Sequence, residues 1–143
     1  MTVHLVKLCV GAETILDLED WVNRRTRYNR ERGIGNVHDH VTRMFPKRRE
    51  DLLAGGSIYW VIKGLVLARQ QILDLQTVSG EDGINRCAIL LRPPLILTEP
   101  QPKRAFQGWR YLPLPDAPAD LSAGDGGGLG PKLKAELAEL GLL

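Results

Sequence analysis

The chain has 143 residues, of which 43% are hydrophobic and 25% are charged, and its formal net charge is +2. This size and composition are typical of one globular domain and exclude a chain that is disordered over its whole length. No apolar run is long enough to span a membrane, and the N-terminus lacks the apolar core of a signal peptide, so we expect a cytoplasmic protein. Cys9 and Cys87 lie in apolar runs and are expected to be buried and unpaired.

The first third of the chain predicts a strand followed by a helix. Residues 3–10 are rich in Val and Leu and predict a buried strand that Lys7 interrupts. Thr14 is a suitable N-cap with Asp17 three residues later, so we expect a helix to begin there. Apolar residues then recur at helical spacing, and Gly33 is expected to end the helix.

The segments after the helix are mostly extended. The strongest strand is residues 57–62, which are dense in β-branched and aromatic side chains. A turn at Lys63 and Gly64 would make residues 65–78 its partner strand, although helical spacing also fits that stretch. The other predictions, in order, are a strand or extended loop at 37–44, a short helix at 47–54, a strand at 86–91, an extended piece at 95–98, a Pro-rich non-helical segment at 99–104 and an aromatic segment at 106–112 that includes a loop.

This order predicts an α+β domain, in which one mixed, curved β-sheet or pseudo-barrel carries flanking helices. We assign residues 1–121 to the domain and the glycine-rich residues 122–130 to a linker. Residues 131–143 predict a C-terminal amphipathic helix with Leu133, Leu137 and Leu140 on its apolar stripe. This helix could pack on its own domain, or it could bind a partner protein or a second copy of the chain.

Positive charge is concentrated in residues 21–49, which carry nine basic and two acidic side chains. The arginines of the predicted helix lie in its later turns, where cations are favourable. Lys47, Arg48 and Arg49 instead stand at the start of the short helix, which prefers anions, and a bound phosphate would relieve that conflict. The alternative is a solvated basic turn.

Aromatic side chains could stack a base in two places. Tyr59 and Trp60 are neighbours on a strand, so they face opposite sides and one of them is expected in the core. Trp109, Arg110 and Tyr111 lie in a segment flanked by Gly and Pro, which predicts a loop of the kind that often carries binding residues.

Metal binding and nucleophilic catalysis have less support. His38 and His40 would share one face of a strand, which is a possible ligand geometry, and Asp39 between them is expected to be a turn residue. No metal-site motif accompanies these histidines, and the chain has no nucleophile motif. We therefore predict no metal, no cofactor and no catalytic residue.

Several stretches are similar to a bacterial family of uncharacterised proteins. They lie within residues 4–11, 42–44, 46–48, 55–64, 68–70 and 106–111. This resemblance implies no activity.

A more distant resemblance is to the EVE and ASCH members of the PUA-like superfamily. It lies in the order of a first strand with Lys7, a basic helix, the pair Thr42 and Arg43, a short helix, two glycines and an aromatic strand. The resemblance implies a pseudo-barrel that binds RNA or modified nucleobases in a pocket lined by aromatic and polar groups. It also implies that Lys7 and the pair Thr42 and Arg43 approach that pocket.

We therefore predict a module that binds nucleic acid or a modified nucleotide, with RNA favoured over DNA and with no membrane partner. The anion-binding candidates are Lys7, Arg24, Arg25, Thr42, Arg43, Lys47, Arg48 and Arg49. The stacking and pocket candidates are Tyr59, Trp60, Trp109, Arg110 and Tyr111. Two alternatives remain open, namely an enzyme that holds a small anionic substrate with Lys7 and Arg43, and a protein-interaction adaptor that uses residues 131–143.

Overall fold

The computed structural model describes residues 1–121, and the predicted linker and C-terminal helix lie outside them. The elements are β1 (Val3–Leu8), α1 (Ile15–Glu31), β2 (His38–Thr42), α2 (Arg49–Leu53), β3 (Ser57–Ile62), β4 (Leu65–Ser79), β5 (Asn85–Leu91), β6 (Ile96–Pro102), β7 (Trp109–Pro113) and a 3₁₀ turn at Leu114–Asp116. The expected α+β class is confirmed. Within residues 1–121, no helix is long and apolar enough to cross a membrane.

The strands form one mixed, open sheet in the order β2-β5-β4-β3-β1-β7, and β6 also pairs with β4. β1 and β3 are parallel, whereas every other pairing between these strands is antiparallel. The parallel pair is possible because α1, β2 and α2 form the long connection between its two strands.

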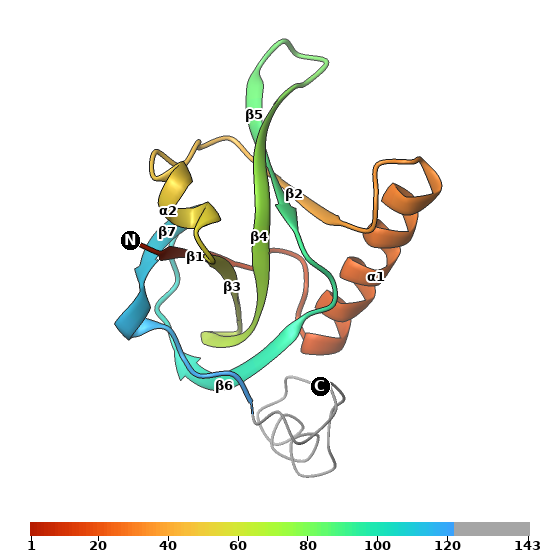
Figure 1. Ribbon diagram of the computed structural model, residues 1–143. Helices are drawn as coiled ribbons and strands as arrows, with labels where there is room; N and C mark the ends of the chain where they lie inside the picture. The colour runs from red at the N-terminus through yellow and green to blue at the C-terminus, as the bar shows by residue number, and fades with distance from the viewer. Residues whose placement is uncertain (122–143) are drawn as a thin grey trace.

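The long strand β4 gives the sheet its curvature (Figure 1). Its first half pairs with β3 and β6, and its second half pairs with β5. The pairing register shifts between Ile72 and Asp74, where the strand passes from one set of partners to the other. Such a bulge bends a strand and increases its twist, and the β4–β5 hairpin consequently projects from the body of the molecule (Figure 1).

The concave face of the sheet and helix α1 enclose the main core. α1 begins as expected, with a capping box in which the Thr14 side chain accepts from the Asp17 N–H and the Asp17 carboxylate accepts from the Thr14 N–H. Its buried apolar side chains, Ile15, Leu18 and Val22, join the same core as Trp60 and Trp109. Tyr59 belongs to a second, smaller apolar cluster on the other face of the sheet, with Val6, Val61, Val66 and Leu112.

Three local expectations were wrong. Residues 109–113 form strand β7 because β1 offers a free edge for antiparallel pairing, which places Lys7 opposite Trp109. Asp39 lies in strand β2, paired with Leu90, rather than in a turn. Helix α2 begins at Arg49, so the basic residues mostly precede it.

The charge conflict expected at the start of α2 is therefore smaller than the sequence suggested. The first turn of this helix carries Glu50 and Asp51, which are favourable there. The segment from 99 to 102 is also ordered by pairing, since Gln101 and Pro102 extend β6 along β4.

Gly56 provides a test of the packing between β1, α2 and β3. A Cβ atom at this position would lie 2.3 Å from the Val3 carbonyl oxygen and 2.5 Å from that of Leu52, and both are backbone atoms that cannot swing away. We expect Gly56→Ala to lower the free energy of unfolding by about 2–3 kcal/mol, as overpacking does, measured by urea denaturation. Gly33→Asn is the control, because Gly33 has open space around it and Asn tolerates its positive φ. Equal stability of the two variants would contradict this account.

Candidate functional site

Four of the predicted site residues, Lys7, Arg24, Arg25 and Trp60, line two adjoining hollows at the junction of β1, α1, β2 and β3. The inner hollow is a cavity of about 70 Å³. It is lined by Lys7, Leu8, Cys9, Val10, Leu18, Trp21, His38, His40 and Trp60. The outer hollow is an open groove of about 490 Å³, lined by Trp21, Arg24, Arg25, Tyr28, His38, Asp39 and His40. Trp21, His38 and His40 line both, so the groove leads towards the cavity.

Lys7 is the cation of the inner cavity. In the sheet register it lies between Trp60 of β3 and Trp109 of β7. Its side chain is half-buried, and this desolvation lowers the pKa of its ammonium group. Within residues 1–121 no carboxylate forms an ion pair with Lys7. Burial also raises the pKa of the neighbouring Cys9 thiol to about 11, so that thiol is neutral and supplies no counter-charge.

The buried amide of Gln70 connects β4 to His38 and Trp60. Its Oε1 atom accepts from the Trp60 indole N–H at 3.1 Å and lies 3.1 Å from His38 Nδ1. Gln70 has no exposed surface, and His38 is only 7% exposed. Burial lowers the pKa of His38, so its imidazole is neutral near pH 7.

His40 lines the same cavity from strand β2, two residues after His38. Its ring contacts Trp60 edge-to-face, with centroids 5.3 Å apart. His40 Nε2 is buried and has no hydrogen-bond partner in the described part of the chain. Desolvation, together with the charge of Lys7 and the nearby His38, lowers the pKa of His40 to about 4. The cavity thus has one cation and two neutral imidazoles.

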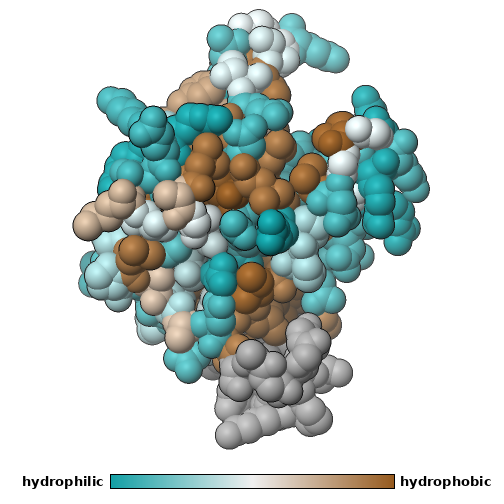
Figure 2. All heavy atoms as spheres, in the orientation of Figure 1, coloured by the Kyte–Doolittle hydropathy of each residue, from teal (hydrophilic) through white to brown (hydrophobic). Residues whose placement is uncertain are grey.

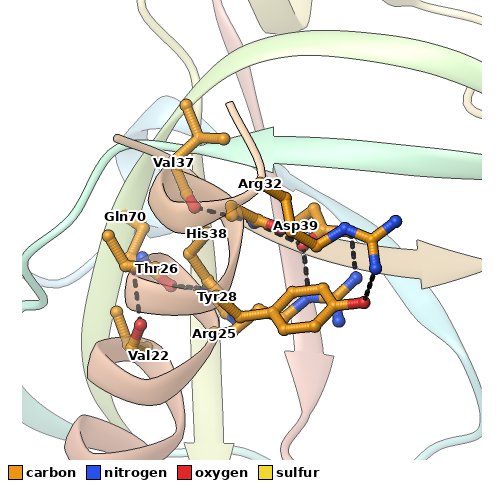
Figure 3. A network of polar contacts seen from close by, with 10 residues as sticks. Val22, Arg25, Thr26, Tyr28, Arg32, Val37, His38, Asp39 and Gln70 are labelled. Atoms are coloured by element: carbon orange, nitrogen blue, oxygen red, sulfur yellow. Dashed lines mark hydrogen bonds and ion pairs between the residues drawn. The ribbon is translucent and has the colours of Figure 1, made fainter. Parts of the chain in front are cut away.

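Asp39 ties the outer groove to helix α1 (Figure 3). Its two carboxylate oxygens accept from Arg25 Nε and Nη2 at 2.7 and 3.0 Å, and Asn29 Nδ2 donates to the same carboxylate at 2.8 Å. These bonds lower the pKa of Asp39 to about 2. Asn29 also donates to the Val37 carbonyl, so one buried amide holds both the loop before β2 and β2 itself.

Two aromatic side chains of α1 form the groove rim. The guanidinium groups of Arg25 and Arg32 lie over the Tyr28 ring, at 4.8 and 4.9 Å from its centroid (Figure 3). Trp21 is 39% exposed, and its ring lies so close to Gly11 that a Cβ atom there would be 2.8 Å from Cη2. The missing side chain at Gly11 therefore lets the indole lie across the mouth of the cavity.

The second group of predicted site residues lies around the loop between β2 and α2. The Tyr111 hydroxyl accepts from the backbone N–H groups of Lys47 and Arg48 at 2.8 and 3.0 Å. Arg48 pairs with Asp51, and Arg49 pairs with Asp74 and donates to the Leu75 carbonyl. The backbone donors expected to bind an anion thus already have a protein partner.

Trp109 also contacts the loop between β2 and α2. The Trp109 indole N–H donates to the Met44 carbonyl at 2.9 Å, and the ring is only 4% exposed. The Arg110 guanidinium lies over the Phe106 ring, 5.6 Å from its centroid. Arg43 is exposed, and Thr42, at the end of β2, is half-buried. None of these residues lines the inner cavity.

A further hollow of about 130 Å³ lies under this loop, between it and the β4–β5 hairpin. Its lining is Phe45, Pro46, Arg49, Leu75, Gln76, Thr77 and Cys87. Figure 2 shows hydrophobic side chains gathered at the foot of the projecting hairpin. Since Arg49 is engaged with Asp74, this hollow is mainly apolar and lacks the unpaired charge of the Lys7 cavity.

Sequence reasoning did not single out Trp21, Tyr28, Asn29 or Gln70, and it considered the histidines only as metal ligands. The signal for Gln70 was a polar side chain inside the strand predicted at residues 65–78. Among the residues that the structure describes, no group of three or more His, Cys, Asp or Glu side chains is arranged to hold a metal ion. Tyr59 faces away from the cavity and packs edge-to-face on His4, at a centroid distance of 5.0 Å.

A family model described as a protein of unknown function (DUF1489) matches residues 5–143, which is nearly the whole chain. No curated protein and no solved structure gave a match.

The buried histidines give a pH-dependent prediction. The pKa of His40 is about 4 in the folded protein and about 6.5 in the unfolded chain, so the unfolded state binds more protons between these values. The neutral state of the buried His40 therefore favours folding fully above pH 6.5. As the pH falls towards 4, the free energy of unfolding decreases by up to about 3 kcal/mol. An NMR titration of the imidazole signals together with urea denaturation at each pH measures it. A His40 midpoint near 6.5 would contradict this prediction.

The contact between α1 and β2 gives a second prediction. Asp39→Asn keeps the shape of the side chain but removes the charge that two Arg25 N–H groups contact. We expect the free energy of unfolding to fall by about 1–2 kcal/mol, since hydrogen bonds to a charged group are worth this much when half-buried. Asp20→Asn is the matched control, because it removes a pair with Arg24 that is more than half exposed and should change stability by less than about 0.5 kcal/mol. Similar losses in both variants would contradict the role given to Asp39.

Proposed function

We propose that this chain, which belongs to the DUF1489 family of proteins of unknown function, binds nucleic acid or a modified nucleotide. In this proposal a base occupies the cavity beside Lys7, and phosphates follow the groove lined by Arg24 and Arg25. The observation that carries the proposal is the Lys7 ammonium group, which has no carboxylate partner among residues 1–121 and lies in a cavity walled by Trp21 and Trp60.

The two tryptophans would have different roles. Trp60 is only 2% exposed, so its ring is a fixed wall. Trp21 is 39% exposed at the junction of cavity and groove, and it is free to stack on a planar base that enters. Base–aromatic stacking is worth about 1–3 kcal/mol and tolerates any base. Stacking on Trp21 would therefore supply affinity, while polar groups deeper in the cavity would supply selectivity.

The groove has a positive surface that suits a phosphate backbone. Arg24 pairs with Asp20, but this pair is more than half exposed and an anion could compete for the guanidinium. Arg25 is held by Asp39 and so has less capacity to bind a phosphate. Arg27 and Arg30 are exposed farther along the same helix and add to the positive potential. Binding of this kind weakens with rising salt concentration.

The finer fold assignment also belongs to this proposal. A curved sheet with a cavity beside the first-strand lysine supports a PUA-like pseudo-barrel, and a nucleic-acid ligand is consistent with a cytoplasmic protein. Two predicted contacts are less well supported, because Arg43 does not line the cavity and the N–H groups of Lys47 and Arg48 already donate to Tyr111.

An enzyme acting on a small anionic substrate is the second candidate. It is favoured by the two neutral imidazoles of His38 and His40 beside Lys7, since neutral imidazoles can accept protons. It is opposed by Arg43, the expected second anion-holding residue, which lies outside the cavity. We therefore give priority to the binding function.

Two substitutions test the proposal with single-stranded RNA followed by fluorescence anisotropy. Lys7→Met removes the cation but keeps the length of the side chain, and we expect at least a tenfold loss of affinity. Arg24→Gln should weaken binding severalfold and reduce its salt dependence. Arg30→Gln is the matched control, because it removes the same charge from the same helix outside the groove.

The expected control result is a change of less than about twofold for Arg30→Gln at moderate salt. Absence of binding by the wild-type protein, or equal losses for Arg24→Gln and Arg30→Gln, would contradict the proposed site.

A further inference from the structure

We propose that Gln70 determines which atoms of the cavity donate and which accept hydrogen bonds. The cavity then selects a base with a lactam edge, in which a carbonyl group adjoins a ring N–H. Uracil, guanine and hypoxanthine have this edge. The inference rests on the proposed function, because it concerns which base enters the same cavity. Gln70 acts here as a positioning residue, since it lies behind His38 and Trp60 and does not line the cavity itself.

The first step is the orientation of the Gln70 amide. The Trp60 indole nitrogen can only donate, and it lies 3.1 Å from one end of this amide. That end must therefore be the oxygen. Both side chains are buried, with Gln70 at 0% and Trp60 at 2% exposure, so water does not compete for this contact. The amide nitrogen is directed instead to the Arg92 carbonyl, at 3.4 Å.

The second step is the tautomer of His38. The same Gln70 oxygen lies 3.1 Å from His38 Nδ1, and an oxygen that only accepts requires a proton on that nitrogen. A neutral imidazole carries one N–H, so His38 Nε2 has a free lone pair and is an acceptor. Burial lowers the pKa of this ring and keeps it neutral. Trp60 and Gln70 together thus present an acceptor on the wall of the cavity.

The third step is the match to a ligand. Lys7 can only donate and His38 Nε2 can only accept, so the complementary edge has an acceptor beside a donor. A lactam edge supplies a carbonyl oxygen for Lys7 and a ring N–H for His38. Cytosine and adenine also have a donor beside an acceptor, but their donor is an exocyclic amine, which is less acidic than the ring N–H of a lactam. The lactam N–H therefore makes the stronger hydrogen bond to His38, and the Lys7 charge on the adjoining carbonyl polarises this N–H further.

The effect on selectivity is large because His38 is buried and Lys7 is half-buried. A ligand that leaves His38 Nε2 or Lys7 without a partner loses the hydrogen bonds that these groups make with water outside. His40 Nε2, which is buried and has no partner in the described structure, lies on the same cavity and offers a further polar contact to the bound edge.

Calorimetric titration of the wild-type protein with three nucleotides tests the inference. The nucleotides are uridine monophosphate, its N3-methyl derivative and cytidine monophosphate, which share the ribose and phosphate. We expect the N3-methyl and cytidine compounds to bind at least tenfold more weakly than uridine monophosphate. Equal binding of all three, or a preference for cytidine, would overturn the inference and leave the proposed binding function intact. Absence of binding by all three, and by single-stranded RNA, would instead contradict the proposed function.

Gln70→Glu tests the positioning role. A carboxylate at this position still accepts from Trp60, but it also stabilises a positively charged His38, whose Nε2 then carries a proton and donates. The cavity would then offer two donors, which match the adjacent N3 and O2 acceptors of cytosine. We expect the preference to shift from uridine towards cytidine monophosphate by at least tenfold, and ¹⁵N chemical shifts of His38 to report the added proton.

Gln71→Glu is the matched control, because it makes the same change at the next residue, whose side chain points to the other face of the strand. It should leave both the nucleotide preference and the His38 signals unchanged. If Gln70→Glu folds and protonates His38 but keeps the wild-type preference, the positioning role is wrong. If this variant does not fold, the wild-type titration with the three nucleotides still decides the inference.

Discussion

One buried side-chain amide oxygen on β4 connects the edge strand β2 to the inner strand β3 of the curved sheet. Gln70 Oε1 accepts from Trp60 on β3 and lies within hydrogen-bond distance of His38 Nδ1 on β2, although these strands are not neighbours in the sheet. The contact is possible only because β4 bends where its partners change from β3 and β6 to β5. A buried amide without partners would be costly, so this arrangement stabilises the curvature that creates the cavity. The same contact determines which histidine nitrogen faces a ligand.

The basic side chains fall into two classes that differ in their partners. Around the loop after β2, Arg48 forms an ion pair with Asp51 and Arg49 forms one with Asp74. The Tyr111 hydroxyl accepts hydrogen bonds from two backbone N–H groups of this loop. These cations therefore contribute to the packing of α2 and β7. Lys7 has no such match within the described residues, and its charge is held among tryptophans and neutral imidazoles. An unmatched cation in a partly desolvated cavity is a stronger indication of ligand binding than a denser run of solvated arginines.

Helix α1 links the cavity to the rest of the molecule. Its apolar face fills the concave side of the sheet, while Arg25 and Asn29 hold β2 through Asp39. The position of His38 and His40 relative to Lys7 therefore depends on both the core and this polar contact. Trp21 lies on the exposed side of the same helix, where Gly11 leaves space for its ring. A ligand that stacked on Trp21 would contact helix α1, which is already held in place by the core and by its polar contact with Asp39.

Local pattern in the sequence determined most elements of the fold, including the capped helix α1, the aromatic strand β3 and the turn at Lys63 and Gly64. These depend on hydrogen bonds and periodicity within a few residues, and Lys7 was recognisable because it interrupts an apolar strand. Only the tertiary structure decided that residues 109–113 become a strand, since that requires the distant edge of β1. It also decided that Lys7, rather than Arg43, lies in the cavity, and that Gln70 reaches His38 across 32 residues of sequence. The bend of β4 brings these groups together, and it depends on which strands pair along its length, which no local stretch of sequence specifies.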